Sequence, residues 1–144
     1  MITDTLAILC AGGFAGAAIY ITAVQHPAMV SCGAQVAVTV FRPMYRRAAK
    51  MQAALALIGM LAGVGTWAFR GGVVWLVGGL ILGSVIPLTL FVIMPINTRL
   101  LDTELDITSA EADGLLAQWA KLHAIRSVAG GVAFIVFVIA STTT

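Results

Sequence analysis

The chain has 144 residues, of which 60% are hydrophobic and only 10% are charged, and its mean hydropathy is +1.03. This composition is typical of a protein that resides in a lipid bilayer, and the length allows one domain. Eight Lys and Arg against six Asp and Glu give a net charge of +2, which offers no support for nucleic acid as a partner.

Four apolar stretches are each long enough to cross a bilayer, whose hydrocarbon core takes roughly 20 helical residues. They cover residues 5–24, 48–69, 73–94 and 122–140. Backbone amides in lipid must be hydrogen-bonded within the protein, and helices achieve this within each segment. The sequence therefore predicts an all-α fold, an integral membrane four-helix bundle in which residues 1–144 form a single domain.

The first stretch is interpreted as a retained span rather than a signal peptide, because it carries Asp4 and no basic segment at its start. It ends at His26 and Pro27. Residues 27–45 then mix apolar side chains with Ser31, Gly33 and Pro43. This composition predicts an interfacial segment between helices 1 and 2.

Small residues and one proline mark where the spans meet or bend. Pro87 lacks the amide that would bond the Gly83 carbonyl, so we expect a kink in the third span. A kink opens a cavity in some bundles, and a bend with no ligand is the alternative. Pairs of glycines four residues apart predict close helix packing at three places: Gly12 and Gly16, Gly59 and Gly63, and Gly79 and Gly83.

The third connection, residues 97–119, gathers five acidic residues and is expected to be solvated. Thr108 followed by Glu111 has the spacing of a capping box. The sequence therefore predicts a helix that begins near Ser109 and runs unbroken into the fourth span.

Basic residues give the expected orientation. The first connection holds Arg42, Arg46, Arg47 and Lys50, the third holds Arg99 and Lys121, and the short second turn holds only Arg70. Basic loops remain in the cytoplasm, so loops 1 and 3 are predicted to be cytoplasmic. Both termini would then lie outside, in a bacterial-type inner membrane.

The two cysteines are expected to stay unpaired. Cys10 and Cys32 are about 33 Å apart along a helix, whereas a disulfide needs Cα atoms within about 7 Å. Neither cysteine belongs to a CxxC or CxxCH motif, so a zinc knuckle and covalently attached haem are unsupported.

Polar residues from four separate segments are predicted to meet at the cytoplasmic end of the bundle, because successive helices alternate in direction. They are His26, Gln52, Asn97, and the pair His123 and Arg126. Trp119 shares a helix face with that pair, at spacings of four and three residues. Each residue also has a structural interpretation: helix capping for His26 and Asn97, snorkelling for Arg126, and an aromatic belt for Trp119.

Four runs in the sequence together resemble the anthrone-oxygenase-like family of four-span membrane proteins. The runs are His26-Pro27, residues 41–47 from Phe41 to Arg47, Pro95-x-Asn97-x-x-Leu100, and Trp119-x-x-x-His123-x-x-Arg126. Some fungal members of this family oxidise anthrones to anthraquinones with dioxygen, without a flavin or haem. The resemblance implies catalytic roles for His123, Arg126 and Asn97, substrate binding by Trp119, Tyr45 and His26, and no cofactor.

The corresponding hypothesis is an oxygenase that acts on a flat hydrophobic phenol or anthrone-type substrate. His123 would remove a proton, since its unperturbed pKa of about 6.5 suits transfer near neutral pH. Arg126 and Asn97 would stabilise the resulting oxyanion, and Trp119 and Tyr45 would stack on the ring.

Two alternatives stay open at this stage. In the first alternative, His26 and His123 jointly ligate copper, iron or a haem, since imidazole suits all three. Otherwise the protein is a non-enzymatic membrane protein that binds a lipid, a quinone or a partner membrane subunit, or that forms a homo-oligomer. Membrane lipid and a hydrophobic small molecule are the partners common to these hypotheses.

Overall fold

The computed structural model describes residues 2–143, and every regular element in this range is a helix. The elements form four rods, each long and apolar enough to cross a membrane. This confirms the predicted all-α, four-span architecture. In chain order they are α1 (Ile2–Tyr20), the π-helix η1 (Ile21–Gln25), α2 (His26–Ser31), α3 (Ala34–Arg70), α4 (Val73–Pro87), the π-helix η2 (Leu88–Ile93), α5 (Met94–Leu101) and α6 (Ala110–Thr143).

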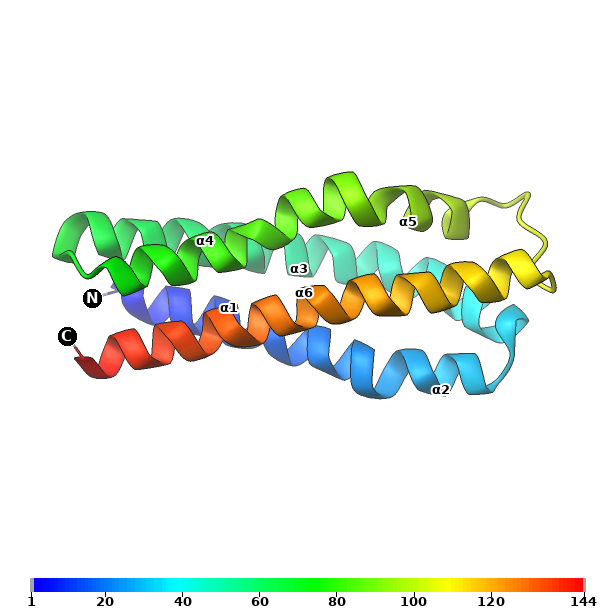
Figure 1. Ribbon diagram of the computed structural model, residues 1–144, viewed down its shortest axis with the longest axis horizontal. Coiled ribbons are helices and arrows are strands. Elements are labelled where there is room, and N and C mark those ends of the chain that lie inside the picture. The colour runs from blue at the N-terminus through cyan, green and yellow to red at the C-terminus, as the bar shows by residue number, and fades with distance from the viewer. Residues whose placement is uncertain (1, 144) are drawn as a thin grey trace.

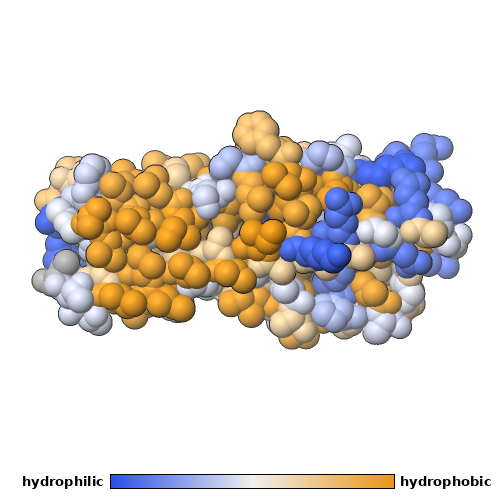
Figure 2. Space-filling model, viewed as in Figure 1, coloured by the Kyte–Doolittle hydropathy of each residue, from blue (hydrophilic) through white to orange (hydrophobic). Residues whose placement is uncertain are grey.

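The four rods lie side by side in one elongated bundle (Figure 1). α1 packs against α3 and α6, and α4 packs against the same two helices from the other side. The connections α2–α3 and α5–α6 lie at one end, and the α3–α4 turn lies with the two chain ends at the other (Figure 1). Hydrophobic residues cover the length of the bundle, and hydrophilic ones gather at the end that holds the α5–α6 connection (Figure 2). The two long connections thus share one end, and the side of the membrane that they face stays a prediction.

The helices extend well beyond the predicted spans at this connection end. Residues 27–45, expected to be a separate interfacial segment, are helical except for the break at Cys32 and Gly33. Gly33 has a φ of 94°, a conformation that favours glycine. α3 continues through Pro43 because tertiary contacts hold it: Phe41 is buried, and Arg42 donates hydrogen bonds to the carbonyls of Leu100 and Asp102. The expected interfacial segment is therefore helical, made of α2 and the start of α3, and its position relative to the membrane surface stays a prediction.

The start of α6 at Ala110 confirms the predicted helix, but its cap differs from the prediction. The Ser109 hydroxyl accepts the Ala112 N–H at 3.2 Å, while Thr108 binds Asp106 and Glu111 binds Arg99. The expected capping box between Thr108 and Glu111 is therefore not formed. In the same connection, the backbone N–H of Glu104 and the Arg99 guanidinium lower the pKa of Asp102.

Glycines bring the helices together at two of the three predicted pairs. A Cβ on Gly63 would lie 2.7 Å from Phe137, and one on Gly79 would lie 3.1 Å from the Met60 carbonyl. Gly59 and Gly83, their partners four residues away, are equally crowded. In the first pair, Gly12 faces Phe134, whereas Gly16 has no neighbour within 4 Å. Cys10 and Cys32 are both free, as expected.

The core consists of two apolar clusters with a polar layer between them. One cluster, near the chain ends, includes Phe14, Trp75 and Phe137, and the other, near the connections, includes Phe41 and Trp119. Along α3 and α6, buried polar residues separate the two clusters; they are Gln52, His123, Arg126 and Ser127. Gln52 and Arg126 lie at mid-length of their helices, because α3 and α6 begin more than ten residues before the predicted spans.

Candidate functional site

Two π-helical segments position side chains in the polar layer. In η1 the His26 N–H bonds the Ile21 carbonyl, and in η2 the Met94 N–H bonds the Thr89 carbonyl, so both bonds span five residues. Each segment directly precedes a residue-proline pair, His26-Pro27 or Met94-Pro95. A proline lacks the amide for an α-helical bond and its ring crowds the carbonyl four residues back, which a wider turn relieves. π-turns occur frequently at functional sites, and both of these border the polar layer.

Aromatic rings from three helices surround Trp119. The imidazoles of His26 and His123 both stack on its indole, with ring centroids 5.2 Å and 4.5 Å away. Phe41 contacts the indole edge-on at 5.2 Å and stacks on Tyr45. Rings thus pack on several sides of Trp119, and only 3% of its surface is exposed. Protein contacts therefore fix its orientation.

A hydrogen-bonded chain connects Trp119 with Tyr45 through Asn97. The indole Nε1–H donates to Asn97 Oδ1 at 2.8 Å, and Asn97 Nδ2 donates to the Tyr45 hydroxyl at 3.0 Å. Asn97 is fully buried, and its amide orientation is fixed because the indole can only donate. The Tyr45 O–H hydrogen is left to point elsewhere, since its oxygen accepts from Asn97.

A second chain holds His123. Its Nδ1 lies 2.9 Å from the Thr22 hydroxyl, which in turn lies 2.7 Å from the Ser127 hydroxyl. Ser127 also donates to backbone carbonyls, those of Ala18 and His123. These bonds fix the imidazole through Nδ1 and leave Nε2 as the nitrogen with which His123 would exchange a proton.

Arg126 is a buried cation that no carboxylate neutralises. Its side chain donates to Gln52 Oε1 at 2.9 Å, and its guanidinium carbon lies 5.5 Å from the centre of the Phe14 ring. Within residues 2–143, no acidic side chain forms an ion pair with it. Arg126 Nε and Gln52 Nε2 are both buried, and neither has a hydrogen-bond partner among the described residues. Unpaired buried donors are costly, so this pair favours an additional acceptor.

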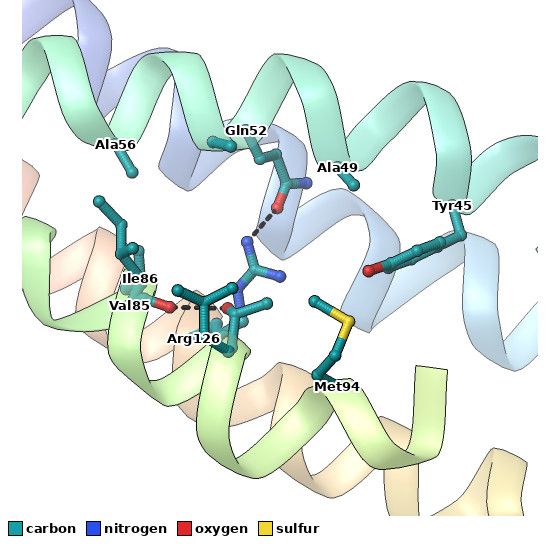
Figure 3. Close-up of a pocket in the computed structure, with 11 residues that line it drawn as sticks. Tyr45, Ala49, Gln52, Ala56, Val85, Ile86, Met94 and Arg126 are labelled. Atoms are coloured by element: carbon teal, nitrogen blue, oxygen red, sulfur yellow. Dashed lines mark hydrogen bonds between the residues drawn. The ribbon is translucent and has the colours of Figure 1, made fainter. Parts of the chain in front are cut away.

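A pocket of about 160 Å³ lies beside this pair, between α3, the α4–η2 segment and α6. Gln52 and Arg126 both line it and are hydrogen-bonded to one another, and the Tyr45 hydroxyl points toward them (Figure 3). The rest of the lining is mainly apolar, and Ala53 and Leu90 at its rim are exposed on the side of the bundle. The lining residues are Tyr45, Ala49, Gln52, Ala53, Ala56, Val85, Ile86, Thr89, Leu90, Met94 and Arg126. The pocket adjoins Pro87, where a kink had been expected.

Two smaller, separate cavities are lined in part by residues of η1 and α2. One, of about 10 Å³, is lined by Tyr45, Gln52, Arg126 and also by His123. The other, of about 80 Å³, lies on the far side of His123 and is lined by Thr22 and His26. The buried His26 Nε2 has no hydrogen-bond partner in the described part of the chain. His123 therefore lies between the two small cavities and does not line the large pocket.

The six residues singled out from the sequence lie together in the structure, but in different positions relative to the large pocket. Arg126 and Tyr45 line it directly. Trp119 and His123 line the smaller cavities, and His26 lines the farther one. Asn97 lies behind Tyr45 and lines none of these three cavities.

The sequence analysis did not identify the residues that hold these groups in place. Thr22 and Ser127, which bind His123, and Phe41, which packs on Trp119, were missed. A signal existed for two of them, because Thr22 precedes His26 by four residues and Ser127 follows His123 by four. Gln52 was noted as polar, but its bond to Arg126 depends on how α3 and α6 pack.

In the alternative hypothesis, His26 and His123 ligate a metal or a haem. The rings of both residues contact Trp119. In the range 2–143, no group of three His, Cys, Asp or Glu side chains is arranged to hold a metal ion. A metal held by His26 and His123 would therefore need further ligands in addition to these two imidazoles.

Comparison with protein families gives one finding. The family model described as anthrone oxygenase matches residues 41–136, about two thirds of the chain. The match includes Tyr45, Gln52, Asn97, Trp119, His123 and Arg126. Comparisons with curated proteins and with solved structures give no match.

Proposed function

The chain belongs to the anthrone oxygenase family, and on that premise we propose that it is a membrane-embedded oxygenase acting on a flat hydrophobic phenol or anthrone-type substrate. The observation that carries this proposal is that Arg126 and Gln52 both line the pocket, and that each holds a buried nitrogen without a hydrogen-bond partner among the described residues. A buried cation beside an apolar pocket favours a flat ligand that develops negative charge on an oxygen atom.

The proposed reaction converts one ring carbon to a carbonyl. Anthrones are tautomers of phenols, and loss of one proton from either form gives the same oxygen-stabilised anion. The carbon para to the oxygen then transfers electrons to dioxygen and gives a hydroperoxide. Loss of water leaves a quinone, so the balance is substrate plus O₂ giving quinone plus H₂O. The carbon is oxidised, one oxygen atom enters the product, and the other leaves as water.

Arg126 and Gln52 would hold the substrate oxygen and stabilise its negative charge. A single oxyanion donor contributes about 3 to 4 kcal/mol to the transition state in enzymes where this has been measured. Because the guanidinium has no carboxylate partner, its charge would not be offset before the substrate anion forms. Tyr45, which lines the same pocket, would contact the ring.

His123 would be the base and would act across the small cavity that it shares with Tyr45, Gln52 and Arg126. A cavity of about 10 Å³ has room for roughly one water molecule, which would pass the proton to Nε2. Thr22 keeps the ring in place through Nδ1. Asn97 would be a positioning residue that orients Tyr45 and Trp119, with His26 supporting Trp119 from the other small cavity.

The proposed site would lie between mid-length and the cytoplasmic end of the bundle, because Gln52 and Arg126 are central in their helices while Tyr45 and Trp119 are closer to the basic connections. No resident cofactor is needed for this reaction, since deprotonation makes the substrate itself an electron donor to dioxygen. The hypothesis that His26 and His123 bind copper, iron or a haem remains the alternative for the chemistry.

The first experiment measures dioxygen uptake by the detergent-purified protein with anthrone as the probe, after subtraction of spontaneous oxidation. We expect Arg126→Gln to lower kcat by about 10² to 10³ fold and His123→Ala by about 10² to 10⁴ fold. Arg46→Gln is the matched control, because Arg46 is exposed on α3 and should leave turnover unchanged. Circular dichroism and gel filtration verify that each variant folds.

Two results would overturn the proposal. If the wild-type protein takes up no dioxygen with anthrones or simpler phenols, the oxygenase function is wrong. If uptake is unchanged in both site variants, the site is wrong. The same preparations are analysed for metal and for haem absorption, because a stoichiometric metal or haem that disappears in His123→Ala would make His123 a ligand.

A non-enzymatic function is the second candidate, and the same donor pair favours it. A quinone carbonyl or a lipid phosphate would accept hydrogen bonds from Arg126 and Gln52 as well as a phenolate would. A quinone or lipid that copurifies with the wild type but not with Arg126→Gln, in the absence of dioxygen uptake, would establish this function. A stably copurifying membrane protein would instead indicate an accessory subunit.

A further inference from the structure

The pocket beside Arg126 has room for about one aromatic ring. Its volume is about 160 Å³, and an apolar cavity of about 150 Å³ in another protein holds a single benzene molecule. Pockets that enclose drug-sized ligands usually measure about 300 to 1,000 Å³. A larger ligand can therefore place only one ring inside and must extend out through the opening.

Three polar side chains are directed into this pocket, whose remaining lining is mainly apolar. Arg126, Gln52 and Tyr45 supply the polar groups, and Figure 3 shows these three side chains directed toward a common space. Thr89 also lines the pocket, but its hydroxyl donates to the Val85 carbonyl at 2.6 Å and is not available to a ligand. The remaining lining is alanine, valine, isoleucine, leucine and methionine. A ligand would be oriented with its oxygen inward and its apolar part toward the opening.

The opening faces the side of the bundle, not its end. Ala53 on α3 and Leu90 in η2 form the rim, and Leu90 is 53% exposed. Ala53 lies at mid-length of the rod Ala34–Arg70, and Leu90 lies within the rod Val73–Leu101. Both positions are far from either end of a membrane-spanning rod, so the opening faces the acyl chains of the bilayer.

From these features we infer the ligand class and its entry route, on the basis of the proposed function. The ligand is a phenol with one ring and a long apolar tail, and the tail is not on the carbon para to the oxygen, because that carbon must carry a hydrogen atom to become the second carbonyl of a quinone. It enters from the bilayer through the opening between α3 and η2, with its hydroxyl group first. The ring fills the pocket with its oxygen at Arg126 and Gln52, and the tail passes Ala53 and Leu90 and stays among the lipid chains.

The test measures binding of phenols with tails of increasing length to the protein in zwitterionic lipid nanodiscs. Phenol, 4-butylphenol and 4-octylphenol are the probes, and the two alkylphenols report binding alone because a tail on the para carbon prevents its oxidation to a quinone carbonyl. Octylbenzene serves as a probe without the hydroxyl. Ala53→Phe narrows the opening, and Ala54→Phe is its matched control, because Ala54 is exposed on the same helix but does not line the pocket. Each probe also partitions into the lipid of the disc. Because the discs are identical, the ratio of the affinities of two variants for one probe does not depend on this partitioning.

We expect Ala53→Phe to weaken binding of 4-octylphenol at least tenfold relative to wild type, while Ala54→Phe changes it less than twofold. Leu90→Ala, which widens the opening, should not weaken it. Arg126→Gln should weaken all three phenols by a similar factor, and octylbenzene should bind to none of the proteins. Ala53→Phe should still bind phenol within threefold of wild type, which verifies that the variant folds.

The inference and the proposed function fail separately. If 4-octylphenol binds equally to wild type, Ala53→Phe and Ala54→Phe, the lateral entry route is wrong, whether or not dioxygen uptake is observed. If Ala53→Phe also weakens binding of phenol, the test is repeated with Leu90→Trp, which narrows the opening from η2. If both variants weaken binding of short and long phenols by the same factor, the tail does not pass through this opening. Tail-dependent binding without dioxygen uptake would retain this ligand class and refute the oxygenase.

Discussion

At the scale of single residues, Asn97 could be singled out from the sequence, but what it does depends on the residues that it contacts. Its Oδ1 accepts from Trp119 and its Nδ2 donates to Tyr45, so both ends of the amide are used. Its Nδ2 carries a second N–H, but Asn97 lines none of the three cavities and is therefore not placed to donate to a ligand in them. Its contribution is to fix two aromatic side chains, and under the proposed function Arg126 and Gln52 would contact the substrate.

Asn97→Ala should destabilise the protein, because it leaves the buried Trp119 Nε1–H without an acceptor. An unsatisfied buried donor costs roughly 1 to 3 kcal/mol. Thr98→Ala is the control: Thr98 is exposed and bonds only the Met94 carbonyl, so a change within about 0.5 kcal/mol is expected. Unfolding in mixed detergent micelles, followed by tryptophan fluorescence, measures both. Equal midpoints for the two variants would contradict the importance of this bond.

At the scale of the elements, the π-helices and the glycines decide how close the helices come and which side chains face inward. The two π-segments each precede a proline, and they border the polar layer where Thr22, His26, Thr89 and Met94 lie. Pro87 was expected to bend the third span, and the structure places the start of η2 directly after it. The pocket is thus bordered by an irregular helix turn on one side and the regular helix α3 on the other.

Gly63 and Gly65 on α3 give a matched test of helix packing. A Cβ on Gly63 would lie 2.7 Å from Phe137 and 3.1 Å from the Trp75 carbonyl, whereas one on Gly65 meets nothing within 4 Å. Gly63→Ala should therefore destabilise the protein by about 1 to 3 kcal/mol through overpacking. Gly65→Ala should be neutral or stabilise it by up to about 1 kcal/mol, since alanine favours helix. Thermal unfolding in detergent measures both, and a stability loss for Gly65→Ala as large as that for Gly63→Ala would show that the packing is misassigned.

At the scale of the whole molecule, charge and hydropathy divide the bundle into an apolar body and one hydrophilic end. The basic residues of the first and third connections gather at that end, and the chain ends lie at the opposite one (Figures 1 and 2). This distribution is the physical basis for the predicted orientation, in which the connections face the cytoplasm.

The two free cysteines provide a test of this orientation. Cys32 is exposed between α2 and α3 at the connection end, and Cys10 is buried. A membrane-impermeant maleimide should therefore label inside-out vesicles but not intact cells, and Cys32→Ser should abolish the labelling. Labelling of intact cells to the same extent as the vesicles would place the connections outside and reverse the orientation.

The sequence by itself determined the architecture and singled out candidate site residues. Long apolar runs leave helices as the stable structure in lipid, so the four rods followed from composition alone. Polar residues are costly in such runs, which singled out His26, Gln52, Asn97, His123 and Arg126 before their contacts were known. Trp119 followed from helical spacing, and Tyr45 from the family resemblance. The resemblance carried by the same residues agreed with the family match.

Only the tertiary structure decided how the site is arranged. The extension of α2 and α3 into residues 27–45 depends on contacts made by Phe41 and Arg42 with distant segments. The bond between Gln52 and Arg126 joins residues 74 positions apart, and no local pattern specifies such a pair. Helical periodicity gives the face on which a side chain lies, but the packing of four helices determines which faces meet. For this reason the sequence could propose candidate residues, while the pocket and its opening on the side of the bundle appear only in the tertiary structure.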